Sequence, residues 1–248
     1  MTKNIVVRLV LCVLMLGIWV GGAVAAEKVC FDQENPPFMY QKGDSPAGLY
    51  PALIAEAFKR MDVPLTMECL PWNRALAGAD AGEWGVGGIY QNAERLKKYD
   101  YSEPIFAEKL MIFVLQGSEF AFSGVTDLSG KTIGVMRGWS YGDDFDAAVA
   151  AGSITKDEVE SDEMNFKKLI AGRLDALIAT PETWAGLQGE LDKDGKVVSL
   201  PTPMAENNTY LIFNKSAGKT DLLTRFNETV AAMKADGTVE KLAVDNFK

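Results

Sequence analysis

Short apolar stretches of strand length alternate with amphipathic segments along most of the chain. The segment LYPALIAEAFKRM (49–61) carries apolar residues at helical spacing and has Pro51 in its first turn, so a helix is predicted there. Strand-like runs lie on either side of it, at 28–32 (KVCFD), 66–70 (TMECL) and 84–90 (WGVGGIY). Strands that alternate with helices favour a parallel sheet with helices on its faces.

The alternation breaks at two long strand-like runs, EKLMIFVLQG (108–117) and NTYLIFNK (208–215), with a second series of strands and helices between them. The pattern therefore predicts two α/β lobes joined by two hinge strands. Lobe 1 is expected to comprise residues 27–112 and 212–248, and lobe 2 residues 113–211. The space between two such lobes is a natural ligand cleft.

The first 26 residues have the organisation of a secretory signal peptide. Lys3 and Arg8 give a basic start, an apolar run follows at 9–20, and the small residues GGAVAA (21–26) suit a cleavage site. The alternative is an uncleaved membrane anchor, since residues 9–26 carry no charge. The small-residue end favours cleavage and a periplasmic location.

Charge and composition narrow the function classes. The chain has 25 Lys+Arg against 34 Asp+Glu, a net charge of −9, and no histidine. The acidic balance argues against nucleic acid or an anionic membrane as partner. The lack of histidine removes imidazole metal sites and His-based nucleophile systems, and no phosphate-binding GxxxxGK[ST] loop is present. We therefore predict no metal, no cofactor and no catalytic residue.

Two cysteines remain after the predicted cleavage, Cys30 and Cys69, each in a strand-like stretch. In an oxidising compartment two thiols are more often paired than free, so a disulfide between neighbouring strands is expected. Two buried free thiols are the alternative.

Candidate ligand contacts come from the strand ends, because ligands of open parallel sheets bind beyond the carboxyl ends of the strands. The residues that follow these ends are 32–38, Trp72, Tyr90, Arg95, Trp139, Ser140, Asp162 and Thr180.

Arg95 and Ser140 have the chemistry to hold an anion. A guanidinium can grip a carboxylate through two parallel hydrogen bonds, although an arginine in a polar stretch such as NAERLKK is, taken alone, usually a solvated helix charge. Ser140 precedes a helix predicted from about Tyr141, where backbone N–H groups and the helix dipole favour negative charge. Alternatively Ser140 simply caps that helix.

Six segments, taken in order, resemble the family 3 periplasmic solute-binding proteins, the polar amino-acid receptors of ABC importers. They are NPPFMY, PWNRAL, AERLKKYDYSEPI, DLSGKTIGVMRGWS, LIAGRLDALIA and YLIFNK. The resemblance covers nearly all of the chain after residue 26. It implies the two-lobed type II periplasmic binding protein fold. It also implies that Arg95 clamps the ligand's α-carboxylate, with Trp139 and Ser140 as donors to the same group.

The chain departs from the family pattern around the ligand's amine. The aspartate expected after the DALIA strand is replaced by Thr180, which also suits a helix start before a proline. Tyr50 replaces an acidic residue of the first lobe's helix, and Asn35 replaces an aromatic residue. Gly87 and Gly88 stand where small hydroxyl residues often assist, and Gly88 is taken as a further ligand contact.

Two interpretations of these departures stay open. Glu182 or Asp162 could bind the amine, since both lie near strand ends of the same lobe. Alternatively the ligand is a carboxylate without an α-amine, packed among Trp72, Tyr90, Trp139 and Tyr141.

The sequence thus predicts a monomeric periplasmic receptor that closes on a small carboxylate-bearing solute and delivers it to an ABC permease. One alternative is an enzyme on the same fold, similar to cyclohexadienyl dehydratases, with Glu182 as the acid. Another is a receptor for a membrane sensor kinase or chemoreceptor.

Overall fold

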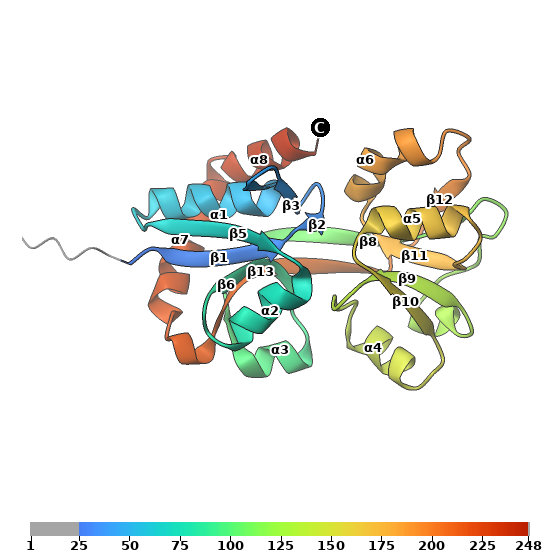
Figure 1. The fold of residues 1–248 in the computed structure, drawn as a ribbon, viewed down its shortest axis with the longest axis horizontal. Coiled ribbons are helices and arrows are strands. Elements are labelled where there is room, and N and C mark those ends of the chain that lie inside the picture. Colours follow the sequence, from blue (N-terminus) through green and yellow to red (C-terminus); the bar gives the residue numbers. More distant parts are fainter. Residues whose placement is uncertain (1–24, 248) are drawn as a thin grey trace, which may run out of the picture.

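The structure, a computed structural model, describes residues 25–247. Two α/β lobes lie along the long axis of the molecule, and two long strands run between them (Figure 1). These strands, β8 (Phe106–Leu115) and β13 (Ala205–Asn214), pair antiparallel, with Leu110 opposite Ala205 and Phe106 opposite Thr209. The two long strands predicted as the link between the lobes are present as such.

Lobe 1 is built on three parallel strands. β1 (Glu27–Asp32) lies between β5 (Leu65–Leu70) and β6 (Gly85–Tyr90) and is parallel to both. In Figure 1, α1 and α8 cover one face of this sheet, and α2 and α3 cover the other. The lobe's remaining elements are β2 (Glu34–Asn35), β3 (Met39–Lys42), β4 (Ser45–Ala47), α1 (Leu49–Arg60), α2 (Trp72–Asp80), α3 (Ala93–Lys98), β7 (Tyr99–Tyr101), η2 (Lys215–Ala217), α7 (Thr220–Ala235) and α8 (Thr238–Asn246).

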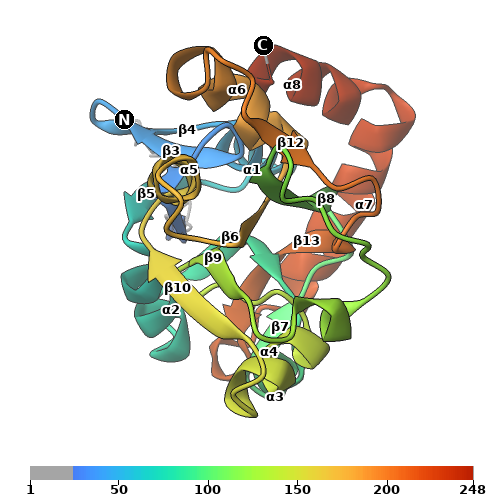
Figure 2. The ribbon, with the colours of Figure 1, turned by 90° about the vertical axis from the view of Figure 1, so that its right-hand side faces the viewer.

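Lobe 2 repeats the arrangement on a smaller scale. β9 (Thr132–Met136) lies between β10 (Thr155–Val159) and β11 (Ala176–Ala179) and is parallel to both, and β11 joins β8 antiparallel. Figure 2 shows this lobe facing the viewer. Its remaining elements are η1 (Val125–Leu128), α4 (Asp143–Ala150), α5 (Asp162–Ile170), α6 (Pro181–Leu191) and β12 (Val197–Ser199).

Each lobe has its own hydrophobic core. One cluster of buried residues draws only on 29–105 and 211–239, and two others draw only on 90–200. Trp139 packs against clusters of both lobes, so one aromatic side chain contacts both cores. Separate cores joined by two strands are the construction that permits hinge motion.

Two helices of lobe 2, α6 and α4, begin next to the cleft between the lobes. Thr180 caps α6, with its Oγ1 accepting from the Thr183 N–H at 3.1 Å and Pro181 at the first helical position, as the sequence predicted. α4 starts at Asp143, later than the predicted Tyr141, after Gly142 at φ 106°. A residue at that φ lies outside the helical region, so the chain turns before the helix begins.

The expected disulfide is absent, because Cys30 and Cys69 are both free and buried. In the parallel register Cys30 lies opposite Glu68, and Cys69 lies opposite Phe31. Since side chains alternate between the faces of a sheet, an offset of one residue places the two thiols on opposite faces. The prediction of a bridge was wrong for this reason.

The predicted signal peptide falls almost entirely outside the described residues. Within residues 25–247, none of the helices combines the length and apolar character needed to cross a membrane.

Candidate ligand-binding cleft

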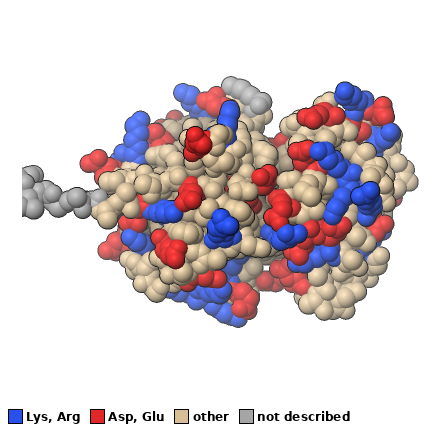
Figure 3. All heavy atoms as spheres, viewed as in Figure 1, with Lys and Arg blue, Asp and Glu red and all other residues tan. Residues whose placement is uncertain are grey.

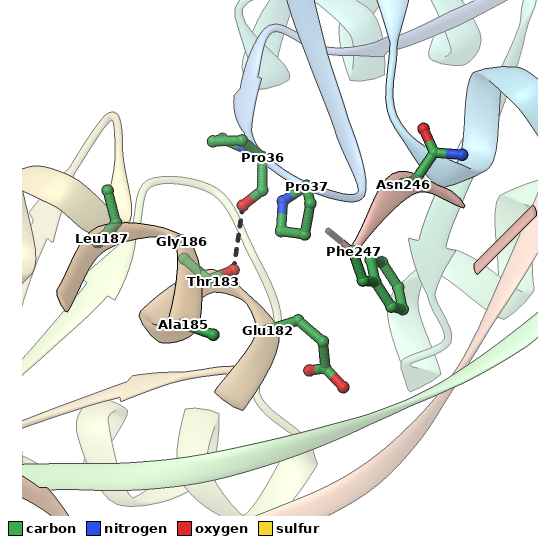
Figure 4. Close-up of a pocket in the computed structure, with 9 residues that line it drawn as sticks. All are labelled: Pro36, Pro37, Glu182, Thr183, Ala185, Gly186, Leu187, Asn246 and Phe247. Carbon is green, nitrogen blue, oxygen red and sulfur yellow. Dashed lines mark hydrogen bonds between the residues drawn. The ribbon is translucent and has the colours of Figure 1, made fainter. Parts of the chain in front are cut away.

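The two lobes contact one another directly across the cleft. The Trp72 indole of lobe 1 donates to the Gly138 carbonyl of lobe 2 at 3.1 Å, and the Trp139 indole of lobe 2 donates to Asp32 Oδ2 of lobe 1 at 3.0 Å. On the other side of the cleft, Thr183 Oγ1 donates to the Pro36 carbonyl at 3.1 Å (Figure 4). The structure is therefore that of a closed molecule.

Arg95 lies buried at this interface. The Asn92 side chain caps α3 by accepting from the Arg95 N–H at 2.8 Å, which fixes the start of the helix. The guanidinium donates to the Tyr90 carbonyl at 3.0 Å and across the cleft to the Gly138 carbonyl at 3.2 Å, and it faces the Trp72 ring at 5.9 Å. Its side chain is not a solvated helix charge.

No described Asp or Glu forms an ion pair with Arg95, whose exposed fraction is 9%. Burial lowers the pKa of the guanidinium from its usual value, although arginine stays charged in proteins. A buried cation that has only carbonyl partners is incompletely compensated. Arg95 can therefore accept an anionic ligand group.

Aromatic side chains of both lobes surround this cation. The Trp139 ring lies 5.4 Å from the Trp72 ring and 5.6 Å, edge-on, from the Tyr90 ring. The structure thus brings four of the predicted site residues, Arg95 with these three aromatics, into one cluster.

The side chains of Ser140 and Tyr141 form hydrogen bonds within lobe 2. The Ser140 hydroxyl donates to Asp146 Oδ2 at 3.2 Å, and it does not cap α4, whose cap is Gly142. The Tyr141 hydroxyl accepts from the Met136 N–H at 2.8 Å, and its ring packs on Phe145. The alternative in which Ser140 caps this helix is wrong, and Ser140 does not stand at the helix start that was expected to favour an anion, because α4 begins three residues later.

Two cavities open between the lobes on the α6 side. The larger, about 180 Å³, is bordered in lobe 1 by the proline pair at 36–37 and by Phe247, and in lobe 2 by the first turns of α6 (Figure 4). Glu182 lines it, and its Oε2 is buried without a hydrogen-bond partner in the described residues.

The smaller cavity, about 50 Å³, adjoins the larger one across the Thr183–Pro36 hydrogen bond. It is lined by Asn35 and Asp162, among others. The Asn35 side chain is 6% exposed, and its Nδ2 finds no partner among residues 25–247. Burial raises the pKa of Asp162 to about 7.

Glu108 is a group that the sequence reasoning missed. It lies on the hinge strand β8 with 2% exposure, and its two carboxyl oxygens accept from the hydroxyls of Tyr50 and Tyr90. Burial, opposed in part by these two donors, raises its pKa to about 7. The available signal was a single carboxylate in an apolar strand, together with Tyr50 at the family's acidic position.

Gly88 makes room for this arrangement. It sits at a register shift between β6 and β13 with φ 77°, and a Cβ there would lie 2.4 Å from Tyr50 Cδ2. A bulge of this kind often lies beside a functional site. Gly88 therefore acts by letting the Tyr50 ring approach the sheet.

Metal ligands are not gathered at the cleft. In the part of the chain that the structure describes, no group of three or more Cys, Asp or Glu side chains is arranged to hold a metal ion.

Buried polar groups that converge between two hinged α/β lobes define the class of solute-binding proteins that close on a small ligand. Residues 28–248 match the family model for bacterial extracellular solute-binding proteins, family 3, and the chain belongs to that family.

Curated relatives cover most of the chain at low identity. The L-cystine-binding protein TcyJ of Escherichia coli K12 is 26% identical over 211 residues, 84% of this chain and 77% of that protein. The putative amino-acid ABC transporter-binding protein PatH of Vibrio harveyi is 26% identical over 217 residues, 85% of this chain and 84% of that protein.

Solved structures share the fold. A histidine kinase sensor domain with similarity to periplasmic binding proteins matches with a TM-score of 0.76 at 18% identity, covering 89% of this chain and 95% of that one. The substrate-binding protein of an amino-acid ABC transporter matches with a TM-score of 0.71 at 22% identity, covering 90% of this chain and 99% of that one. At these identities the likeness establishes the fold alone.

Proposed function

We propose that the protein is a periplasmic substrate-binding protein that captures a small carboxylate-bearing solute, an amino acid or a related compound, for an ABC importer. The observation that carries this proposal is Arg95, a guanidinium buried between the lobes with no carboxylate partner among the described residues. The relatives named for cystine and amino-acid binding support the same ligand class.

In this proposal Arg95 from lobe 1 and the segment Gly138–Ser140 from lobe 2 meet the ligand's carboxylate together. The carboxylate replaces the carbonyl oxygens that now accept from the guanidinium, and it offers two charged acceptors instead. Because only the closed form presents both lobes to the ligand, binding favours closure. Trp72, Tyr90 and Trp139 then exclude water from the ion pair.

The proposal assigns lobe 1 to residues 27–112 and 212–248, lobe 2 to residues 113–211, and the secretory signal to residues 1–26. A mature monomer in the periplasm would present the closed lobes to the permease.

A thermal-shift screen of the mature protein tests the ligand class. Wild type and Arg95→Ala are compared against the common amino acids, L-cystine and the matching 2-hydroxy acids, with the exposed Arg74→Ala as the control. A ligand at 100 times its dissociation constant stabilises the protein by about 2.7 kcal/mol. Binding by wild type and Arg74→Ala together with its loss in Arg95→Ala supports the clamp. Binding retained by Arg95→Ala contradicts it.

An enzymatic function on the same fold has one observation in its favour, the unpartnered Glu182 Oε2 in a cavity. An ancestral amino-acid-binding protein described as a precursor of cyclohexadienyl dehydratase shares the fold at 22% identity with a TM-score of 0.72. Turnover of prephenate by wild type and its loss in Glu182→Gln would establish the enzyme. Binding of prephenate without turnover supports the receptor function.

A further inference from the structure

Two threonines at the start of α6 form a chain of hydrogen bonds that ends on the other lobe. The Thr183 N–H donates to Thr180 Oγ1 at 3.1 Å, and the Thr180 hydroxyl donates to Thr183 Oγ1 at 3.0 Å. The Thr183 hydroxyl donates in turn to the Pro36 carbonyl of lobe 1 at 3.1 Å (Figure 4). Since each hydroxyl has a single proton to give, the direction of this chain is fixed.

The two hydroxyls are shielded from water in the closed molecule, because Thr180 is 5% and Thr183 is 3% exposed. A buried hydroxyl that lacks an acceptor for its proton costs free energy. The Thr180 proton has its acceptor within lobe 2, and the Thr183 proton has its acceptor on lobe 1. Closure therefore exchanges the water around the Thr183 hydroxyl for the Pro36 carbonyl.

Lobe 2 holds the donor of this contact in place. Thr180 caps α6, and Pro181 occupies the first helical position. Trp184, the residue after Thr183, packs on the Phe166 ring in the core of lobe 2, with ring centroids 4.3 Å apart. The Thr183 hydroxyl thus reaches lobe 1 from a helix start whose orientation is set by lobe 2.

Lobe 1 holds the acceptor in place. The loop of residues 35–38, which the structure describes in full, has three carbonyls that accept from backbone N–H groups of the same lobe: those of Asn35, Pro37 and Phe38. The Phe38 side chain is fully buried and stacks on the Tyr50 ring. The remaining carbonyl of the loop, that of Pro36, accepts from lobe 2 instead.

This contact lies across the cleft from the tryptophan contacts. On that other side the Trp72 indole donates to Gly138 and the Trp139 indole donates to Asp32. Opening of the hinge has to break hydrogen bonds on both sides. The closed form is therefore stabilised by groups that all belong to the protein.

We propose that Thr180, Thr183 and the Pro36 carbonyl form a latch, here called the threonine latch, that stabilises the closed form through contact between the lobes alone. Thr183 makes the contact. Thr180 is a positioning residue, because its hydroxyl accepts from the Thr183 N–H and donates to Thr183 Oγ1, which leaves the Thr183 proton for Pro36. The latch acts on the ligand-free protein and does not depend on the identity of the solute.

Hydrogen exchange of tryptophan indole N–H groups measures opening of the ligand-free mature protein. The Trp72 and Trp139 indoles, called the cleft indoles below, donate across the cleft and should exchange when the lobes separate. The Trp84 indole donates to the Ala75 carbonyl within lobe 1 at 2.9 Å, so its exchange reports unfolding of that lobe. NMR follows all three groups in the same sample.

Thr183→Val keeps the shape of the side chain and removes the donor. Loss of this hydrogen bond should speed exchange of the cleft indoles by about two- to tenfold and leave Trp84 unchanged. Thr183→Ser, which keeps the hydroxyl, should stay close to wild type. Thr229→Val is the control, because the Thr229 hydroxyl donates to the Arg225 carbonyl within α7.

Two substitutions at position 180 separate the positioning role from the helix cap. Serine and aspartate cap helices about equally well, but a carboxylate cannot donate to Thr183 Oγ1 and would itself accept the Thr183 proton. Thr180→Ser should therefore exchange like wild type. Thr180→Asp should speed exchange of the cleft indoles at least as much as Thr183→Val does, again with Trp84 unchanged.

Three results would overturn the threonine latch. In the first, the cleft indoles of wild type exchange as fast as in the urea-unfolded protein, which would mean that the ligand-free lobes are open. In the second, Thr183→Val exchanges like wild type, or speeds Trp84 and the cleft indoles equally. In the third, Thr180→Ser and Thr180→Asp behave alike, which would leave Thr180 as a helix cap alone.

Discussion

Gly138 is the residue on which contact between the lobes most directly depends. Its carbonyl accepts both from the Trp72 indole and from the Arg95 guanidinium. Its φ is 74°, and a Cβ built on it would lie 2.1 Å from Asn73 Oδ1. Glycine is thus needed here for the backbone conformation, and in the closed form a Cβ would also displace the end of the exposed Asn73 side chain.

Replacing Gly138 with alanine should therefore weaken ligand binding. The left-handed conformation costs an L-residue about 1–2 kcal/mol, and the clash adds to this only in the closed form. The matched control is Gly152→Ala, since Gly152 has the same φ of 74° with open space around it. We expect both variants to lose stability and only Gly138→Ala to lose more than about tenfold in affinity by titration. Equal affinities of the two variants would contradict the role of Gly138 in closure.

At the scale of the elements, β8 does more than link the lobes. It carries Glu108 between Tyr50 and Tyr90, while the bulge at Gly88 lets the Tyr50 ring lie close to the sheet. A helix, a strand and a hinge strand thereby position one carboxyl group. Changes in any of the three should alter the surroundings of Glu108.

Tyr50→Phe isolates this positioning. The variant keeps the ring that fills the space beside Gly88 and removes one donor to Glu108. A carboxylate that loses a hydrogen bond becomes easier to protonate, so the pKa of Glu108 should rise further. The loss of stability that accompanies ionisation of Glu108 should therefore move to higher pH, and melting temperatures of the variant and wild type across pH 5–8.5 measure this shift. Tyr40→Phe, on the half-buried β3, serves as the control.

The two cysteines give a separate test of strand register. With both thiols buried and on opposite faces of the sheet, neither should react with a thiol reagent in the native protein, and both should react in urea. Addition of a reductant should leave the melting temperature unchanged. A reductant-sensitive melting temperature would indicate a bridge and a different register.

Sequence periodicity was sufficient for the elements, because strands and helices of this length leave clear period-2 and period-3.6 patterns. The strand-end rule placed Arg95 among the candidates, but its polar neighbours favoured a solvated helix charge, and its burial depends on contacts with Gly138 and Trp72 that no local pattern records. Periodicity failed for Cys30 and Cys69, since a register offset of one residue leaves no trace in a single strand. It also missed Glu108, whose partners Tyr50 and Tyr90 lie 58 and 18 residues away along the chain.

At the scale of the whole molecule, surface charge is mixed. Acidic and basic side chains are interspersed over the face shown in Figure 3. The buried acids Asp32, Glu108 and Asp162 form a different population, with pKa values raised by burial to about 6, 7 and 7. Ionisation of these buried acids is less favourable in the folded state than in the unfolded state, so it lowers the free energy of unfolding.

The ligand-free protein should therefore become more stable as the pH falls from 8 to about 5. A group whose folded pKa is raised contributes stability that is fully present below its unfolded pKa and is lost as the pH rises through the folded pKa. Below about pH 4, carboxylates with lowered pKa values, such as Glu56 and Asp80, act in the opposite sense. Melting temperatures across pH 4–8.5 measure this, and Glu108→Gln should flatten the profile. A profile that rises from pH 5 to 8 would contradict the assignment.

Trp72 and Trp139 bring chromophores from opposite lobes together, with ring centroids 5.4 Å apart and ring planes tilted by 36°. At such a separation two indoles couple electronically, and opening of the hinge would separate them. Near-ultraviolet circular dichroism and intrinsic emission should then follow the hinge in real time. The protein thus carries its own optical reporter and could serve as a label-free sensor for the solute it captures.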